Sequence, residues 1–212
     1  EKYIVINDVM IKEGDCISID GSTGNIYLGE IPKVKLDTNE NFKTLLKWLD
    51  EFRKIGVRAN ADTPNDAMHA NQFNTDGIGL CRTEHMFFNK IRIPIVRSMI
   101  LANYEDERKE YLDELLKFQR EDFVEIFKLM DNEPVTVRLL DPPLHEFLPK
   151  TDVEIKNLAA SMGLTMNDML YRIENLKESN PMLGHRGCRL AITFPEIYKM
   201  QARAIIEAAV IS

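Results

Sequence analysis

Cysteine is scarce in this sequence. Only three cysteines, Cys16, Cys81 and Cys188, occur in 212 residues, and they are widely spaced. There is no C-x-x-C pair and no even set, so both a disulfide framework and a structural zinc site are disfavoured. We therefore expect a protein of a reducing compartment, most simply the cytoplasm.

Long apolar runs, a secretion signal and an excess of positive charge are also missing. No apolar run approaches the roughly 18–20 residues of a membrane span. The chain opens Glu1-Lys2-Tyr3, without the basic start and apolar core of a signal peptide. Lys and Arg number 27 against 34 Asp and Glu, whereas nucleic-acid-binding domains are more often basic. The sequence thus predicts neither a membrane nor a nucleic acid as partner.

The two ends of the chain lack the usual features of complete domains. The first residue is not methionine, and residues 204–212 form an apolar helical pattern with no C-cap glycine or proline. We expect an excised part of a longer polypeptide, with a processed or incomplete protein as the alternative.

The first 55 residues differ in pattern from the rest. Residues 1–30 contain short β-branched runs and a strong hairpin turn at 20–25, too little for a domain, so they suggest the end of a preceding β-containing domain. Residues 32–39 have the composition of a polar linker. Residues 41–55 have apolar side chains at helical spacing, which favours a packing surface and allows a hinge.

From residue 56 onward, strand patterns alternate with helix patterns. A strand over 56–62, a helix from Thr63 (N-cap) and Pro64 to 73, and a strand over 77–85 make one βαβ unit with parallel strands. The remaining pattern predicts helical structure over 91–130, a strand over 135–141, two helices over 152–178 joined at Gly163, a loop over 180–193 and a helix from Pro195. The fold class is therefore α/β, the start of a (β/α) barrel or an open sheet, with too few strands to close a barrel of eight.

Arginines recur where the predicted strands end. Arg82 follows the second strand, Arg138 lies in the third, and Arg186 and Arg189 lie in the 180–193 loop. A guanidinium offers a planar fork of donors that matches phosphate and carboxylate oxygens, so the set suits a small substrate carrying both groups and suits phosphoryl transfer. The alternative, equally supported by spacing, is that each arginine pairs with a nearby acid such as Glu84 or Asp141.

Other polar residues give weaker indications. Three histidines, His85, His145 and His185, each lie near an arginine or an acid, where histidine is more often structural than catalytic. Glu84 and Glu146 could bind a hard cation, but no spaced set of carboxylates supports this role.

Two cysteines and one aspartate complete the candidates. Cys81 and Cys188 lack an adjacent base and are expected to be buried thiols. Asp62 could orient an arginine.

Three long segments then stand out as motifs. They are GIGLCRTEHMFF at 77–88, TVRLLDPPLHEFLP at 136–149 and NPMLGHRGCRL at 180–190, in one collinear order. Together they resemble the pyruvate, phosphate dikinase family. Pyruvate, water dikinase and the sugar phosphotransferase enzyme I share the GxGLxRTE core, but HMFF together with DPPLHEF favours the first family.

This resemblance implies a multi-domain enzyme that interconverts ATP, phosphate and pyruvate with AMP, pyrophosphate and phosphoenolpyruvate through a phosphohistidine. It implies three parts here: residues 1–35 as the end of the swivelling phosphohistidine domain, 36–55 as a linker helix, and 56–212 as the first part of a TIM-type (β/α)8 barrel with helical insertions. It also implies Mg²⁺ as cofactor, a homodimer, ATP, AMP and phosphate bound by other domains, and an organelle as a possible location in eukaryotic relatives.

The resemblance carries roles onto particular residues. Arg82, Arg138 and Arg186 match the arginines that contact phosphoenolpyruvate. No catalytic residue and no metal ligand is assigned within the 212 residues, because the Thr-x-x-Ser-His-Ala run of the phosphohistidine does not occur and the magnesium ligands and acid–base cysteine belong to later strands. We expect the chain alone to be inactive. Pyruvate, water dikinase and a non-catalytic anion-binding module are the alternatives.

Overall fold

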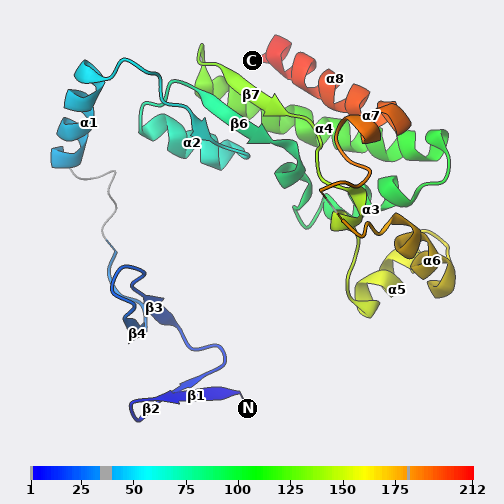
Figure 1. The fold of residues 1–212 in the computed structure, drawn as a ribbon, viewed down its shortest axis with the longest axis horizontal. Helices are drawn as coiled ribbons and strands as arrows, with labels where there is room; N and C mark the ends of the chain where they lie inside the picture. The colour runs from blue at the N-terminus through cyan, green and yellow to red at the C-terminus, as the bar shows by residue number, and fades with distance from the viewer. Residues whose placement is uncertain (1, 34–39, 181) are drawn as a thin grey trace. The chain divides into compact units, whose positions relative to one another are not determined.

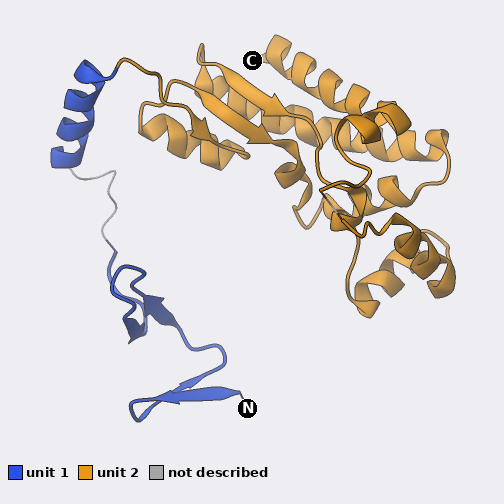
Figure 2. Cartoon of the chain, in the orientation of Figure 1, with its two compact units in different colours: residues 1–53 blue, residues 54–212 orange. Residues whose placement is uncertain are grey.

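The computed structural model (Figure 1) describes residues 2–33, 40–180 and 182–212. The chain divides into two compact units, Glu1–Arg53 and Lys54–Ser212 (Figure 2). Most of the predicted linker, residues 34–39, lies outside the described residues. None of the helices in the described ranges has the length and apolar character that a membrane-spanning segment needs.

The first unit begins with two antiparallel hairpins. Strands β1 (Tyr3–Ile6) and β2 (Val9–Lys12) form one, and β3 (Ile17–Ile19) and β4 (Ile26–Leu28) form the other. Strand β2 was not predicted from the sequence. Its turn is possible because Asn7 and Asp8 both have positive φ, 48° and 64°, the backbone of a tight two-residue hairpin loop.

The predicted turn at 20–25 is present and is held by one side chain. The Asp20 carboxylate accepts the backbone N–H of Ser22 at 2.9 Å and the hydroxyl of Thr23 at 2.7 Å. These bonds lower the pKa of Asp20, because they stabilise its charged form. Helix α1 (Glu40–Phe52) follows, and its apolar stripe is exposed within the described chain, Phe52 by 80%. The predicted packing partner of this stripe therefore stays a prediction.

The second unit is built on a parallel three-stranded sheet in the order β5-β6-β7 (Figure 1). Its strands are β5 (Ala59–Asn60), β6 (Ile78–Arg82) and β7 (Val135–Arg138). The α/β class with parallel strands is confirmed, and the described residues form an open sheet. Helix α2 (Pro64–Gln72) links β5 to β6 and begins as predicted at Thr63, whose side chain accepts from the Asp66 N–H in a capping box.

All three strands are shorter than their patterns predict. Residues 83–87 turn into a 3-10 helix (η2, Thr83–Phe87), and Pro142-Pro143 precede another (η3, Leu144–Phe147). At the start of β5, the backbone N–H of Val57 donates to the Asp76 carboxylate at 2.6 Å instead of to a strand. Side-chain contacts and prolines thus end the ladders that the apolar pattern would extend.

The predicted helical region 91–130 is two helices, α3 (Ile93–Leu101) and α4 (Glu105–Met130). The guanidinium of Arg108 explains the break, because it donates to the carbonyls of Met99 and Ala102 at 3.2 and 2.9 Å. Carbonyls that end a helix need such partners when they are buried. Helix α8 (Pro195–Ile211) runs beside α4 (Figure 1), and Phe123 and Ile126 on the inner side of α4 are fully buried.

Helices α5 (Asp152–Ser161) and α6 (Met166–Leu176) occupy the predicted range 152–178. Gly163 between them has φ +66°, and Thr165 is the N-cap of α6, as predicted. The loop predicted over 180–193 is wrong in its second half, where a short helix, α7 (Cys188–Thr193), forms.

Candidate functional site: an arginine and carboxylate cluster

Two of the predicted arginines end neighbouring parallel strands. Arg82 and Arg138 are register partners at the last positions of β6 and β7. Adjacent strands lie about 4.8 Å apart, and partners in a parallel pair point to the same face of the sheet. The carboxyl ends of parallel strands are where α/β proteins assemble their sites. The pairing of the strands therefore places both side chains at the carboxyl end of the sheet, on the same face.

Asp62 fixes Arg82. One of its carboxylate oxygens accepts the backbone N–H of Arg82 at 2.6 Å, and the other accepts the guanidinium at 3.1 Å. That second oxygen also lies 2.9 Å from Nδ1 of His85. Asp62 is only 8% exposed, so its carboxylate is largely removed from water. The structure thus shows Asp62 in the orienting contact that the sequence suggested.

Glu84 and Asp141 hold Arg138. NH2 of Arg138 bonds to Oε1 of Glu84, a residue that is 4% exposed. NH1 of the same guanidinium lies 3.6 Å from Oδ2 of Asp141. The hydroxyl of Thr83 donates to the Arg138 carbonyl at 3.0 Å, which ties the start of η2 to the end of β7.

Arg186 joins the cluster through the same aspartate. Its NH2 donates to Oδ2 of Asp141, and this bond raises the pKa of the Arg186 guanidinium. The neighbouring Gly187 has φ +54°, and a Cβ there would lie 3.2 Å from Oδ1 of Asp141. Glycine therefore lets the loop pass close to the carboxylate. Arg189, which the sequence grouped with Arg186, is exposed and forms none of the ion pairs in this cluster.

Tyr198 and Gln201 of α8 hold the segment after β7 and the loop before α7, and neither residue was identified from the sequence. The side-chain carbonyl of Gln201 accepts the Leu140 N–H at 2.8 Å. The hydroxyl of Tyr198 lies 2.7 Å from the Leu140 carbonyl and 3.0 Å from that of Gly187. In the sequence both residues look like ordinary members of an amphipathic helix, so no local signal could have identified them.

The ion pairs agree with the alternative that the sequence left open for the arginines. Each of the three arginines pairs with an acid, and the three acids balance their charge. The pairing of Arg138 is incomplete, however. Its Nε and Oε2 of Glu84 are buried and lack a hydrogen-bond partner among the described residues. Buried polar atoms without a partner are individually costly.

The remaining candidates take structural positions or stay unassigned. His185 lies 2.8 Å from the Thr193 hydroxyl through Nε2, whereas Nδ1 of His145 is buried without a partner in the described residues. Burial raises the pKa of the Cys81 thiol to about 12, which agrees with the predicted inert thiol. The same prediction is wrong for Cys188, which is exposed at the start of α7 because that helix forms at the surface.

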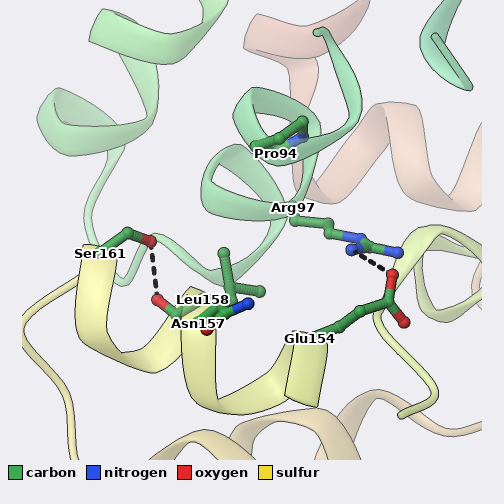
Figure 3. Close-up of a pocket in the computed structure, with 6 residues that line it drawn as sticks. All are labelled: Pro94, Arg97, Glu154, Asn157, Leu158 and Ser161. Carbon is green, nitrogen blue, oxygen red and sulfur yellow. Dashed lines mark hydrogen bonds and ion pairs between the residues drawn. The ribbon is translucent and has the colours of Figure 1, made fainter. Parts of the chain in front are cut away.

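A separate pocket of about 290 Å3 lies between α3 and α5 (Figure 3). Arg97 from α3 points to Glu154, with NH1 3.1 Å from Oε1, and its Nε donates to the Phe147 carbonyl at 2.8 Å. The charged groups in this pocket are therefore already paired. Its lining includes none of the clustered arginines and consists of Pro94, Arg97, Glu154, Asn157, Leu158 and Ser161.

The sheet and its helices form an α/β unit that carries the arginine and carboxylate cluster at the carboxyl ends of β6 and β7. The family model described as PEP-utilising enzyme, PEP-binding domain, matches residues 37–212, so the chain belongs to this family of PEP-utilising enzymes. No group of three or more His, Cys, Asp or Glu side chains within the described ranges is placed to hold a metal ion.

Similar proteins carry one name across bacteria and plants. The chain is 53% identical over 209 residues to the pyruvate, phosphate dikinase of Rhizobium meliloti (strain 1021), covering 99% of this chain and 23% of that protein. It is 52% identical over 198 residues to that of Clostridium symbiosum, covering 93% and 23%. It is 51% identical over 213 residues to the chloroplastic enzyme of Mesembryanthemum crystallinum, covering 99% and 22%. The chain thus spans less than a quarter of the length of these curated relatives.

Proposed function

We propose that this chain is part of a pyruvate, phosphate dikinase and forms one wall of its phosphoenolpyruvate and pyruvate site. The parent enzyme interconverts ATP, phosphate and pyruvate with AMP, pyrophosphate and phosphoenolpyruvate through a phosphohistidine, and it binds the nucleotide and phosphate in other domains. The observation that carries the proposal is the meeting of Arg138 and Arg186 at Asp141, beside Arg82 on the next strand, within a chain that matches the PEP-binding family.

The three guanidinium groups suit a substrate that carries a phosphate and a carboxylate. Each presents a planar fork of donors, and donors aimed at oxygens where charge develops stabilise a phosphoryl-transfer transition state. The incomplete pairing of Arg138 supports a role beyond stability. We assign Arg82, Arg138 and Arg186 to substrate binding and no residue of this chain to proton transfer.

The domain assignment is part of the same proposal. Residues 1–35 end the swivelling phosphohistidine domain, residues 36–55 are the linker that contains helix α1, and residues 56–212 begin a TIM-type barrel with helical insertions. The match of the PEP-binding family from residue 37 and the parallel βαβ order of the second unit support it. We further propose that the parent enzyme is a homodimer that uses Mg²⁺. No group of three or more His, Cys, Asp or Glu among the described side chains is placed to hold a metal ion, so we assign no Mg²⁺ ligand to this chain.

The test replaces each arginine by lysine in the parent enzyme. Lysine keeps the charge but loses the planar fork, so Arg82→Lys, Arg138→Lys and Arg186→Lys should each lower kcat/KM for phosphoenolpyruvate about 10- to 100-fold. Exchange between ATP and AMP, which the other domains perform, should be unchanged. Arg189→Lys is the matched control, because Arg189 is exposed and outside the cluster. Equal losses in kcat/KM for phosphoenolpyruvate and in the exchange between ATP and AMP would contradict the assignment.

The chain by itself provides a second, simpler measurement. We propose that it keeps weak affinity for phosphoenolpyruvate and does not catalyse the overall reaction. Calorimetric titration at low salt should detect binding that Arg138→Lys weakens. The absence of any measurable binding would refute this part.

A further inference from the structure

One oxygen of Asp141 serves two arginines that arrive from different parts of the chain. Oδ2 receives NH2 of Arg186, from the loop before α7, and lies 3.6 Å from NH1 of Arg138, at the end of β7. A separation of 3.6 Å is too long for a hydrogen bond, so the contact with Arg138 is an ion pair only. The carboxylate therefore stands between two guanidinium groups and holds one of them loosely.

The other two acids of the cluster are anchored differently. Asp62 also accepts a backbone N–H, and its side chain is 11% exposed. The Glu84 side chain is 5% exposed and bonds directly to Arg138. The Asp141 side chain, at 28% exposure, is the most open of the three. Asp141 is thus the acid that solvent and a small anion can reach.

The charges of the cluster are balanced without any ligand. Arg82, Arg138 and Arg186 face Asp62, Glu84 and Asp141, three charges of each sign. A phosphate or carboxylate that enters meets guanidinium donors already turned toward Asp141. Its oxygen needs the same donors, and the nearby carboxylate repels it.

We propose that Asp141 is an internal anion that occupies the place of a substrate oxygen between Arg138 and Arg186, and that substrate binding transfers at least one of these arginines from Asp141 to the substrate. This inference rests on the proposed function of the arginines and makes Asp141 a positioning residue. It keeps the two guanidinium groups together while the site is empty, at the expense of affinity for the anion.

The test is the variant Asp141→Asn in the parent enzyme, which keeps the shape of the side chain and removes its charge. KM for phosphoenolpyruvate should fall about fivefold, the effect of one nearby and largely water-screened like charge, while kcat does not rise. Asp141→Glu restores the charge and should return KM to the wild-type value. Asp113→Asn, at an exposed position of α4, is the matched charge-removal control and should change neither constant.

An unchanged or raised KM in a folded Asp141→Asn enzyme overturns the inference. If Arg138→Lys and Arg186→Lys weaken phosphoenolpyruvate binding in the same assay, the proposed function survives that result. If these lysine variants have no effect, the proposed function fails and the inference fails with it. Circular dichroism checks folding, and Asp141→Ser is the second uncharged variant. If neither uncharged variant folds, Asp141 is a structural residue and the inference is overturned.

Discussion

Gly77 sets the register that brings Arg82 beside Arg138, and its replacement by alanine should be severely destabilising. Its φ is +119°, and a Cβ at this position would lie 2.3 Å from the carbonyl oxygen of Pro134. That oxygen accepts the Ile78 N–H at 2.8 Å, the first bond between β6 and β7. A methyl group cannot fit there unless the two strands move apart.

The magnitude follows from two separate costs. A side chain at this φ costs about 1–3 kcal/mol in backbone strain, and relieving a clash with rigid backbone costs about 1–3 kcal/mol more. Gly77→Ala should therefore lower the free energy of unfolding by about 2–6 kcal/mol. Gly163→Ala is the matched control, because Gly163 also has positive φ, +66°, but nothing lies within 4 Å of its Cβ position. This control should lose only about 1–2 kcal/mol.

The assay is urea denaturation of the chain followed by far-UV circular dichroism. Most helical residues belong to the second unit, so the helical signal reports on the unit that contains Gly77. Tryptophan fluorescence would not serve, because the single tryptophan is Trp48 in α1. Equal losses for the two variants, or a loss below about 1 kcal/mol for Gly77→Ala, would refute the reasoning from the Pro134 contact.

Three further predictions follow from buried groups. Arg108→Met leaves two carbonyls at the end of α3 and the carboxylate of Glu196 without their donor. The free energy of unfolding, measured in urea, should therefore fall by about 3–5 kcal/mol. An unchanged free energy of unfolding would contradict the capping role of Arg108. A thiol reagent at neutral pH should label the exposed Cys16 and Cys188 rapidly but label Cys81 only after denaturation; fast labelling of all three would be inconsistent with this burial. Burial raises the pKa of Tyr198 from 10.0 to about 12, so its contribution to stability is intact below pH 10 and is lost as the pH rises toward 12. Tyr198→Phe should lower the free energy of unfolding by about 1 kcal/mol at neutral pH and should weaken this loss of stability at alkaline pH. A variant with the same dependence of stability on pH as the wild type would contradict this prediction.

Most of the second unit could be predicted because its information is local. Thr63 and Pro64 begin a helix wherever they stand before an apolar helical pattern, and Thr165 acts in the same way at α6. The break at 102–104 could not be predicted, because it depends on Arg108 reaching back to carbonyls six and nine residues away. Helix propensity carries no information about such a contact.

In the candidate site, too, some features depend on local sequence and others on contacts between distant segments. Arg82, Arg138 and Arg186 can be chosen from sequence through the resemblance of their motifs to a known family, whereas their spacing alone supports pairing with a nearby acid equally well. The pairing of Arg186 with Asp141 spans 45 residues, and that of Arg138 with Glu84 spans 54. Tyr198 and Gln201 enter the site only because α8 packs where their polar atoms meet backbone groups of the β7 loop.

The sequence by itself determined the α/β class, the starts of α2, α5, α6 and α8, the hairpin turn at 20–25 and the choice of candidate arginines, because each depends on neighbouring residues or on side-chain chemistry alone. Only the tertiary structure decided which acid holds which arginine, that Cys188 is exposed while Cys81 is buried, and that Asp141 stands between two guanidinium groups. These features depend on distances between segments far apart in the chain, which the register of β6 with β7 and the packing of α8 establish.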